Sequence, residues 1–253
     1  MFFAKAGKYE ACRIFSAGHL GLVIVTIACI VLALKKTMHK NKNEVLKIIR
    51  VLTIILWILE ILKMCFNIRY YKLSEVKEWL PLYYCSVLLY ATFLSSFTKG
   101  DFKRSGDVFI ATGSIIGGVC YIILPTTSLP TYPAFHFISL HSFFFHGTMI
   151  YLNLLVNYTK YIKLEKKDIL NYAAIVGIVC LVALFVNIKF DSNLMFISKD
   201  FPNTPIQIIY NYTGKLFTPL MILGQMSVPF YVVYYFLNRV TKKAKCKSIS
   251  EGE

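Results

Sequence analysis

The run Ile14-Phe-Ser-Ala-Gly-His-Leu-Gly-Leu-Val-Ile-Val-Thr-Ile-Ala-Cys-Ile-Val-Leu-Ala-Leu34 contains no lysine, arginine, aspartate or glutamate. A helix of about 20 mostly apolar residues is long enough to cross the ~30 Å hydrocarbon core of a bilayer. The run is too long for the apolar region of a signal peptide, and it lacks a small-residue cleavage site. The sequence therefore predicts that this run is a transmembrane helix.

Six further runs along the chain are similarly apolar. The chain is 57% hydrophobic and only 16% charged, whereas a soluble domain carries about 25% charged residues. The further runs cover residues 45–66, 80–98, 107–124, 135–158, 168–188 and 216–237. We therefore predict an all-α, polytopic membrane helix bundle of about seven transmembrane helices, which forms a single domain over residues 1–253.

The net charge of +15 comes largely from basic clusters between the apolar runs. Segments 35–47, 99–104, 160–167 and 239–247 together hold almost twice as many lysines and arginines as the alternate connections. Because cytoplasmic loops carry such an excess, we expect the N-terminus outside and the C-terminus in the cytoplasm of a multi-pass cell-membrane protein. Such loops contact anionic lipids, so membrane lipids are the expected partners and nucleic acid is not.

Four spans carry an ionisable or nucleophilic side chain at a similar depth. With the N-terminus outside, His19, Glu60, Cys85 and His141 each lie five or six residues from the outer end of a predicted span. At ~1.5 Å per residue, this places them roughly 7–10 Å below the outer boundary. Ionisable groups in spans usually face the bundle interior or a water-filled cavity. The sequence therefore predicts a polar cavity near the outer leaflet.

Other polar residues are candidates for the same cavity. Asn187 and Gln225 lie at slightly different heights in the sixth and seventh spans, and Lys63 is one helical turn from Glu60. Simpler interpretations stay open, because a histidine in a span often serves a hydrogen bond between helices. A lysine three residues from a glutamate also neutralises it on the same helix face.

Two kinds of chemistry fit this set of residues. A cysteine beside a histidine is the minimal pair for acyl transfer, because the imidazole takes the thiol proton and the thiolate attacks a carbonyl. A carboxylate such as Glu60 then orients the imidazole. Without a nucleophile, a carboxylate and histidines suit proton or cation translocation instead. His136, His141 and His146 cannot share one helix face, and His141 is favoured because its depth matches Cys85.

Several short motifs occur in a fixed order along the chain, namely Phe15-Ser-Ala-Gly-His19, Trp79-Leu-Pro-Leu-Tyr-Tyr-Cys85, Ser139-Leu-His-Ser-Phe-Phe-Phe-His-Gly147, Asn187, Asn193-Leu-Met-Phe196 and Pro202-Asn-Thr-Pro205. Together they resemble the motifs of the YwaF family, bacterial integral membrane proteins similar to transmembrane protein 164 of animals. The resemblance implies a bundle of about seven spans and fatty acyl transfer on phospholipids, with a cysteine nucleophile and a histidine base.

Carried over by motif, His141 falls on the family histidine and Cys85 on the cysteine of the bacterial members. The animal cysteine falls on Leu82, and both groups have a histidine where this chain has Tyr83. The leading hypothesis is a phospholipid acyltransferase or lipase-like enzyme, which acts on a lipid or acyl substrate. The alternative is a transporter, or a membrane protein that binds a small molecule or a lipid without covalent catalysis.

The complete set of candidate site residues divides into a catalytic pair and its supporting polar groups. No nucleotide-binding loop, metal-ligand cluster or cofactor motif occurs in the sequence, so we expect neither a cofactor nor a metal. Gly113 and Gly117 permit close helix packing inside the bundle or between copies, and the oligomeric state stays open. The predicted catalytic residues are Cys85 and His141, and the supporting residues are His19, Glu60, Lys63, Tyr83, Asn187, Asn193 and Gln225.

Overall fold

A computed structural model describes residues 1–250 except positions 72, 74 and 203, and it describes side chains as far as residue 240. The predicted basic cluster of Lys242, Lys243, Lys245 and Lys247 therefore lies outside the described side chains. The described residues form helices and loops without strands. In chain order the helices are α1 (Ala17–Thr37), α2 (Lys42–Tyr70), α3 (Val76–Trp79), α4 (Val87–Phe97), α5 (Gly100–Ala111), α6 (Gly113–Ile123), α7 (Phe137–Tyr158), η1 (Lys166–Asp168), α8 (Ile169–Phe190), η2 (Leu194–Phe196), α9 (Pro205–Thr213), η3 (Gly214–Leu216) and α10 (Phe217–Ser250).

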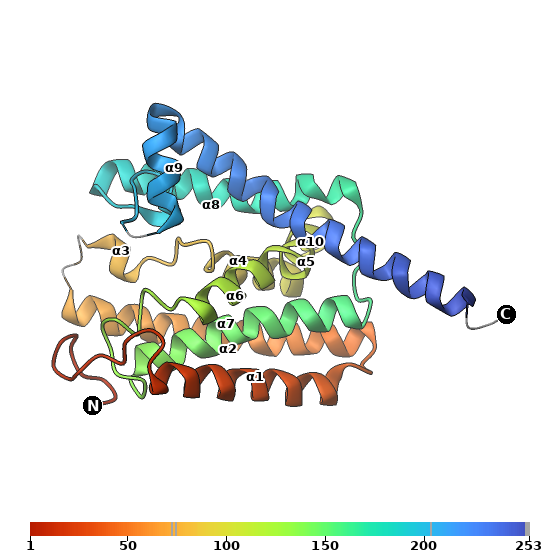
Figure 1. The fold of residues 1–253 in the computed structure, drawn as a ribbon, viewed down its shortest axis with the longest axis horizontal. Helices are drawn as coiled ribbons and strands as arrows, with labels where there is room; N and C mark the ends of the chain where they lie inside the picture. Colours follow the sequence, from red (N-terminus) through yellow and green to blue (C-terminus); the bar gives the residue numbers. More distant parts are fainter. Residues whose placement is uncertain (72, 74, 203, 251–253) are drawn as a thin grey trace.

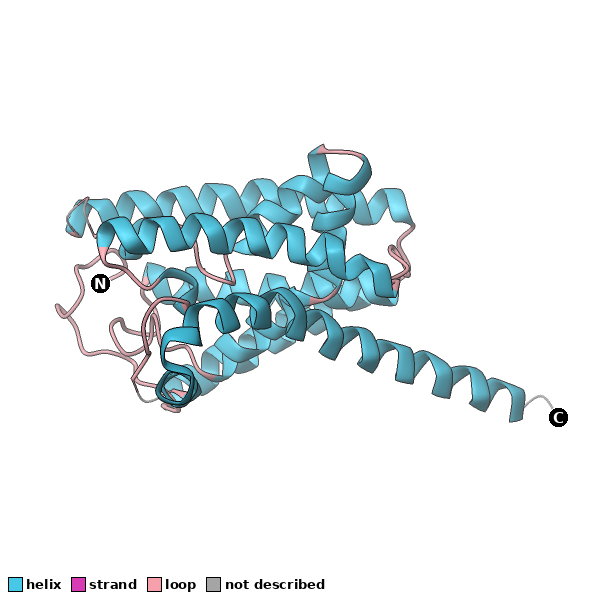
Figure 2. Ribbon diagram, turned by 90° about the horizontal axis from the view of Figure 1, so that it is seen from above, coloured by secondary structure: helices cyan, strands magenta, loops and turns pink. Residues whose placement is uncertain are grey.

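The long helices pack in layers around a central group (Figure 1). Helices α1 and α2 both pack against α7 on one side, while α8 and α10 pack together on the other. Helices α4, α5 and α6 lie between these layers, and α5 contacts α4, α7 and α8. The far part of α10 extends beyond the rest of the molecule (Figure 2). The core therefore lies around the central helices.

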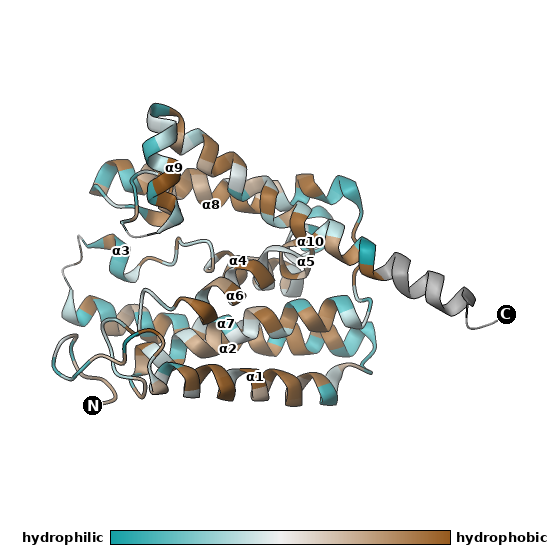
Figure 3. Ribbon diagram, in the orientation of Figure 1, coloured by the Kyte–Doolittle hydropathy of each residue, from teal (hydrophilic) through white to brown (hydrophobic). Residues whose placement is uncertain are grey.

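The sequence of α1 explains both its ends and its position on the outside of the bundle. The Ser16 side chain caps its first turn by accepting a hydrogen bond from the His19 amide. Lys35 and Lys36 occupy the last turn, where positive charge is favourable to the helix dipole. Only His19 and Ile30 are buried, and the remaining surface is largely apolar (Figure 3). A helix with this surface is suited to contact with lipid.

The third predicted span, residues 80–98, is helical only in its second half, as α4. Residues 80–86 form an irregular segment, and Pro81 at its start has no amide hydrogen for a helical bond. Tyr84 in this segment donates to the Gly113 carbonyl at 3.2 Å and lies 2.7 Å from the Tyr172 hydroxyl. Irregular backbone at membrane depth is tolerated only when protein surrounds it. The expectation of a continuous helix over 80–98 was therefore wrong at this point.

The fourth predicted span, residues 107–124, is broken at Thr112 into α5 and α6. A Cβ at Gly113 would lie 2.7 Å from the Tyr84 hydroxyl, and one at Gly117 would lie 2.8 Å from Met149 Cε. Both glycines therefore serve packing inside the bundle, which is one of the two roles that the sequence left open. Among the described helical segments that are long and apolar enough to cross a membrane, Gly100–Ile123 has the largest share of buried residues.

Four helical segments among the described residues are long and apolar enough to cross a membrane, judged by length and composition. These findings establish an all-helical chain with several apolar helices, and the count of seven spans remains a prediction. The four segments are Ala17–Thr37, Gly100–Ile123, Lys166–Phe190 and Pro205–Val240.

Candidate functional site: a buried ionic cluster

Two helices bring three of the predicted site residues together inside the bundle. Glu60 and Lys63 lie one turn apart on α2, and His141 lies on α7. Lys63 Nζ is 2.6 Å from Glu60 Oε1, and His141 Nε2 is 3.5 Å from Glu60 Oε2. Glu60 is 1% exposed and His141 is 5% exposed. We call these three residues the ionic cluster.

The imidazole of His141 is not held by hydrogen bonds. Neither ring nitrogen has a hydrogen-bond partner among the described residues, although both are buried. At 3.5 Å, the Glu60 carboxylate is near enough to stabilise a protonated ring but does not form a short hydrogen bond with it. Buried polar groups without partners are rare and destabilising. The ring of His141 therefore contacts Glu60 of the neighbouring helix α2 without a hydrogen bond among the described residues.

His146 lies on α7, five residues after His141. His146 donates from Nδ1 to the Ser142 carbonyl at 2.7 Å, and its ring stacks on Tyr121 of α6 with centroids 3.6 Å apart. Its Nε2 is buried and has no hydrogen-bond partner in the part of the chain that the structure describes. The stacked ring of His146 therefore packs α7 against α6.

Cys85 lies in the irregular segment just before α4. Its Sγ is 4.0 Å from the Gly117 carbonyl of α6, which is a weak contact for a thiol. Within the described part of the chain, Cys85 makes no hydrogen bond to a histidine. Among the described residues, no hydrogen bond therefore joins the predicted pair of Cys85 and His141.

His19 stands apart from the ionic cluster. The Phe15 amide donates to its Nδ1 at 3.0 Å, so the ring proton is on Nε2, which donates to the Ile122 carbonyl at 3.0 Å. Its ring also packs on Phe143. Both nitrogens are therefore used to fasten the start of α1 to the end of α6.

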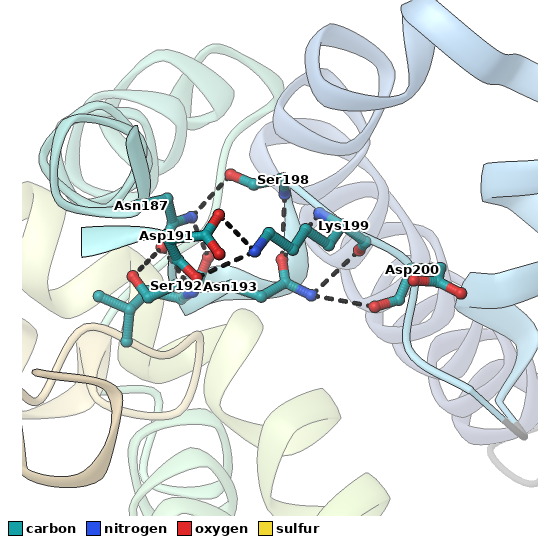
Figure 4. A network of polar contacts seen from close by, with 8 residues as sticks. Asn187, Asp191, Ser192, Asn193, Ser198, Lys199 and Asp200 are labelled. Carbon is teal, nitrogen blue, oxygen red and sulfur yellow. Dashed lines mark hydrogen bonds and ion pairs between the residues drawn. The ribbon is translucent and has the colours of Figure 1, made fainter. Parts of the chain in front are cut away.

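Asn187 and Asn193 build the loop that follows α8 (Figure 4). The side-chain Nδ2 of Asn187 donates to the Leu194 carbonyl and the Ser198 hydroxyl. Its Oδ1 accepts a hydrogen bond from the Leu194 backbone amide at 2.7 Å. The Asn193 side chain donates hydrogen bonds to two backbone carbonyls of the loop and accepts hydrogen bonds from two of its backbone amides. An ion pair between Asp191 and Lys199 at 2.6 Å closes the same loop.

This loop holds strained backbone against the segment that carries Cys85. Met195 and Phe196 have φ of 58° and 53°, a region that costs a residue with a side chain about 1–3 kcal/mol. Gln225 of α10 donates to the Met195 carbonyl at 2.8 Å. The Phe196 ring packs on Tyr83, with centroids 5.5 Å apart. The loop therefore positions Tyr83, two residues before Cys85. The sequence motif marked this loop but not its contact with Tyr83.

The described residues contain no group of three or more histidine, cysteine, aspartate or glutamate side chains that could hold a metal ion. The arrangement offers instead a carboxylate, an imidazole with free nitrogens, an ammonium group and a nearby thiol. These groups can move protons and stabilise charge without further ligands.

Comparison with protein families gives a match over most of the chain. The model of the TMEM164 family matches residues 14–239, which include the ionic cluster, Cys85 and the loop after α8. Neither the curated proteins nor the solved structures gave a match. Because the family model covers most of the chain, this membrane protein belongs to the TMEM164 family.

Proposed function

We propose that this protein is a membrane-embedded enzyme that transfers acyl groups of phospholipids, with Cys85 as nucleophile and His141 as general base. The observation that carries this proposal is the buried ionic cluster, in which the His141 nitrogens are free and the Glu60 carboxylate lies 3.5 Å away. A carboxylate at this position stabilises the imidazolium that forms when the histidine takes a proton.

The reaction proceeds in two halves. His141 takes the thiol proton of Cys85, and the sulfur attacks the carbonyl carbon of a lipid ester. The ester C–O bond breaks, and the leaving oxygen receives the proton from His141 to give a lysolipid and an acyl thioester on Cys85. The hydroxyl of an acceptor then attacks the thioester as His141 removes its proton. That proton returns to the sulfur, which restores the thiol and releases the new ester.

The approach of Cys85 to His141 requires a change at the irregular segment before α4. This segment is held by the contact of Tyr83 with Phe196 and by the Tyr84 hydroxyl, rather than by helical hydrogen bonds. Catalytic contacts often tighten only once substrate is bound. A lipid chain that enters beside this segment therefore supplies the contacts that bring the thiol to the imidazole.

Acyl exchange between a labelled phospholipid and an acceptor alcohol tests the proposal. We expect Cys85→Ala and His141→Gln to abolish the exchange by the purified protein. Cys120→Ala, which removes an exposed thiol on α6, is the matched control and should keep the wild-type rate. Full activity in folded Cys85→Ala would contradict the mechanism.

Proton or cation translocation is the second candidate, and the ionic cluster itself favours it. Glu60 lies between a lysine and a histidine, so a proton can move between groups of different charge inside the bundle. This function predicts ion-dependent uptake into proteoliposomes that survives Cys85→Ala and is lost in Glu60→Gln. The acyl-transfer proposal predicts instead that acyl exchange is lost in both Cys85→Ala and Glu60→Gln.

The proposed topology has seven passes, with the N-terminus outside and the C-terminus in the cytoplasm of the cell membrane. Its support is a pocket of about 720 Å³ whose lining includes Lys42, Arg104 and Lys163, one from each of three predicted cytoplasmic segments. Labelling of single cysteines from either side of the membrane tests this topology. A label at position 42 from the outside of intact cells would contradict it.

A further inference from the structure

A groove of about 620 Å³ lies between α1 and α2, with α7 as its floor. Helix α1 packs closely on α7, since a Cβ at Gly147 would lie 2.8 Å from Thr26 Cγ2. Tyr151 of α7 also donates to the Thr37 hydroxyl at 3.0 Å, near the end of α1. These contacts fix α1 to α7 and leave the side of α1 that faces α2 unfilled.

The lining of the groove fits an apolar occupant. Thr26 and Thr148 donate their hydroxyls to carbonyls of their own helices at 2.7 and 2.8 Å, and the Tyr151 hydroxyl is bonded to Thr37. The hydroxyls in the lining are therefore already used. From Leu22 to Ala33, the α1 wall extends for about 17 Å at ~1.5 Å per residue. A flexible hydrocarbon chain fits this length and this chemistry.

One end of the groove carries a positive charge. Lys47 is the one lysine, arginine, aspartate or glutamate in its described lining, and it lies on the first turns of α2. Among the described residues Lys47 makes no hydrogen bond or ion pair. The nearby Glu44, whose pKa the charge of Lys47 helps to lower, is paired with Lys40 at 2.6 Å. Lys35 and Lys36, in the last turn of α1, add positive charge near the connection between α1 and α2. An anion at this end is therefore favoured.

We infer that this groove binds one acyl chain of an anionic phospholipid, whose phosphate lies beside Lys47. The apolar walls hold the chain, and Lys47 selects the headgroup. Because the site lies at the turn between α1 and α2, its lipid comes from the leaflet at that end of the bundle. The inference does not depend on acyl transfer, since neither Cys85 nor the ionic cluster lines the groove.

Photolabelling of the full chain in phosphatidylcholine nanodiscs tests this inference. The probe is phosphatidylglycerol with a diazirine on one acyl chain, and phosphatidylcholine with the same chain is the comparison. We expect phosphatidylglycerol to label the groove wall, including Cys29, about fivefold more than phosphatidylcholine. Lys47→Gln should remove this preference. Lys160→Gln, which removes an exposed lysine outside the groove lining, should retain it.

A second variant separates a bound chain from lipid that surrounds the whole protein. Ala33→Phe places a ring in the groove and should abolish labelling of the wall, while labelling of Ile24 on the exposed surface of α1 continues. Equal labelling of Ile24 and Cys29 by phosphatidylglycerol would overturn the inference. So would an undiminished preference for phosphatidylglycerol in Lys47→Gln.

Discussion

The loop after α8 offers a sharp test of how the candidate site is positioned, through Asn187→Ala. The Asn187 side chain is 4% exposed and takes part in four hydrogen bonds with Ser192, Leu194 and Ser198. Its oxygen is the hydrogen-bond partner of the Leu194 amide, and Leu194 is fully buried. Alanine removes all four bonds and leaves the Leu194 amide and carbonyl without these partners.

The expected effect follows from those contacts. Each unpaired buried group costs about 1–3 kcal/mol. Two such groups therefore lower the free energy of opening the loop by about 3 kcal/mol, after partial access of water. Because ~1.4 kcal/mol corresponds to a factor of ten, hydrogen exchange at the Leu194 amide should become about a hundredfold faster. The strained backbone at Met195 and Phe196 favours release of the loop once its bonds are lost.

Hydrogen exchange with fragmentation, which resolves single amides, measures this effect in detergent. Ser192→Ala is the matched control, because it removes one hydrogen bond of Asn187 and keeps both bonds between Asn187 and Leu194. Exchange at Leu194 should rise much less in this variant than in Asn187→Ala. Exchange at Leu194 that stays within twofold of wild type in Asn187→Ala would refute the role of this side chain. A uniform rise throughout α8 would refute it too, because it would show general unfolding.

Three further outcomes are expected from single changes. Glu60→Gln should lower the free energy of unfolding by about 2 kcal/mol because it leaves Lys63 without a counter-charge, and adding Lys63→Gln should restore part of this loss in thermal melts. Gly147→Ala should destabilise the protein by about 1–3 kcal/mol because its Cβ would lie 2.8 Å from a methyl carbon of α1, whereas Gly21→Ala, with nothing within 4 Å, should not. The pKa of Glu44 is lowered by its hydrogen bond with Lys40, so the stability it contributes is present above the ordinary pKa of 4.5 and is lost as the pH falls below it. Melts of Glu44→Gln and wild type should therefore converge in acid, and a gap that widens there would contradict this.

Much of the helical fold could be predicted from the sequence. The first, fifth and sixth predicted spans correspond to α1, α7 and α8 with ends that differ by a few residues. These helices were predictable because each is a long run that no proline interrupts. The third and fourth spans depend on local exceptions, namely Pro81 and the break at Thr112, which a hydropathy average does not resolve.

The candidate site was less predictable. The spacing of Glu60 and Lys63 indicated their ion pair, because residues three apart share a helix face. Depth alone could not separate His141, whose nitrogens are free, from His19, whose nitrogens bond backbone groups at Phe15 and Ile122. The partners of His19 and Asn187 include backbone atoms, and any residue type supplies those. No sequence pattern therefore reveals such partners.

The strained loop after α8 has a conformation that its sequence does not indicate. Its sequence, Asn193-Leu-Met-Phe196, contains no glycine, yet Met195 and Phe196 both adopt positive φ. The hydrogen bonds of Asn187 and Asn193 offset that strain, and the result is the contact between Phe196 and Tyr83. We expect this contact to control how far the segment with Cys85 can move.

The most direct measurement for acyl transfer is the intact mass of the protein after incubation with a phospholipid that carries an alkyne-labelled acyl chain. Wild type should gain one acyl mass at Cys85 that hydroxylamine removes, and Cys120→Ala should gain the same mass. His141→Gln should remain unmodified. An acyl group that forms on Cys85 equally without His141, or no acyl group on Cys85 in protein that turns over lipid, would contradict the proposed mechanism.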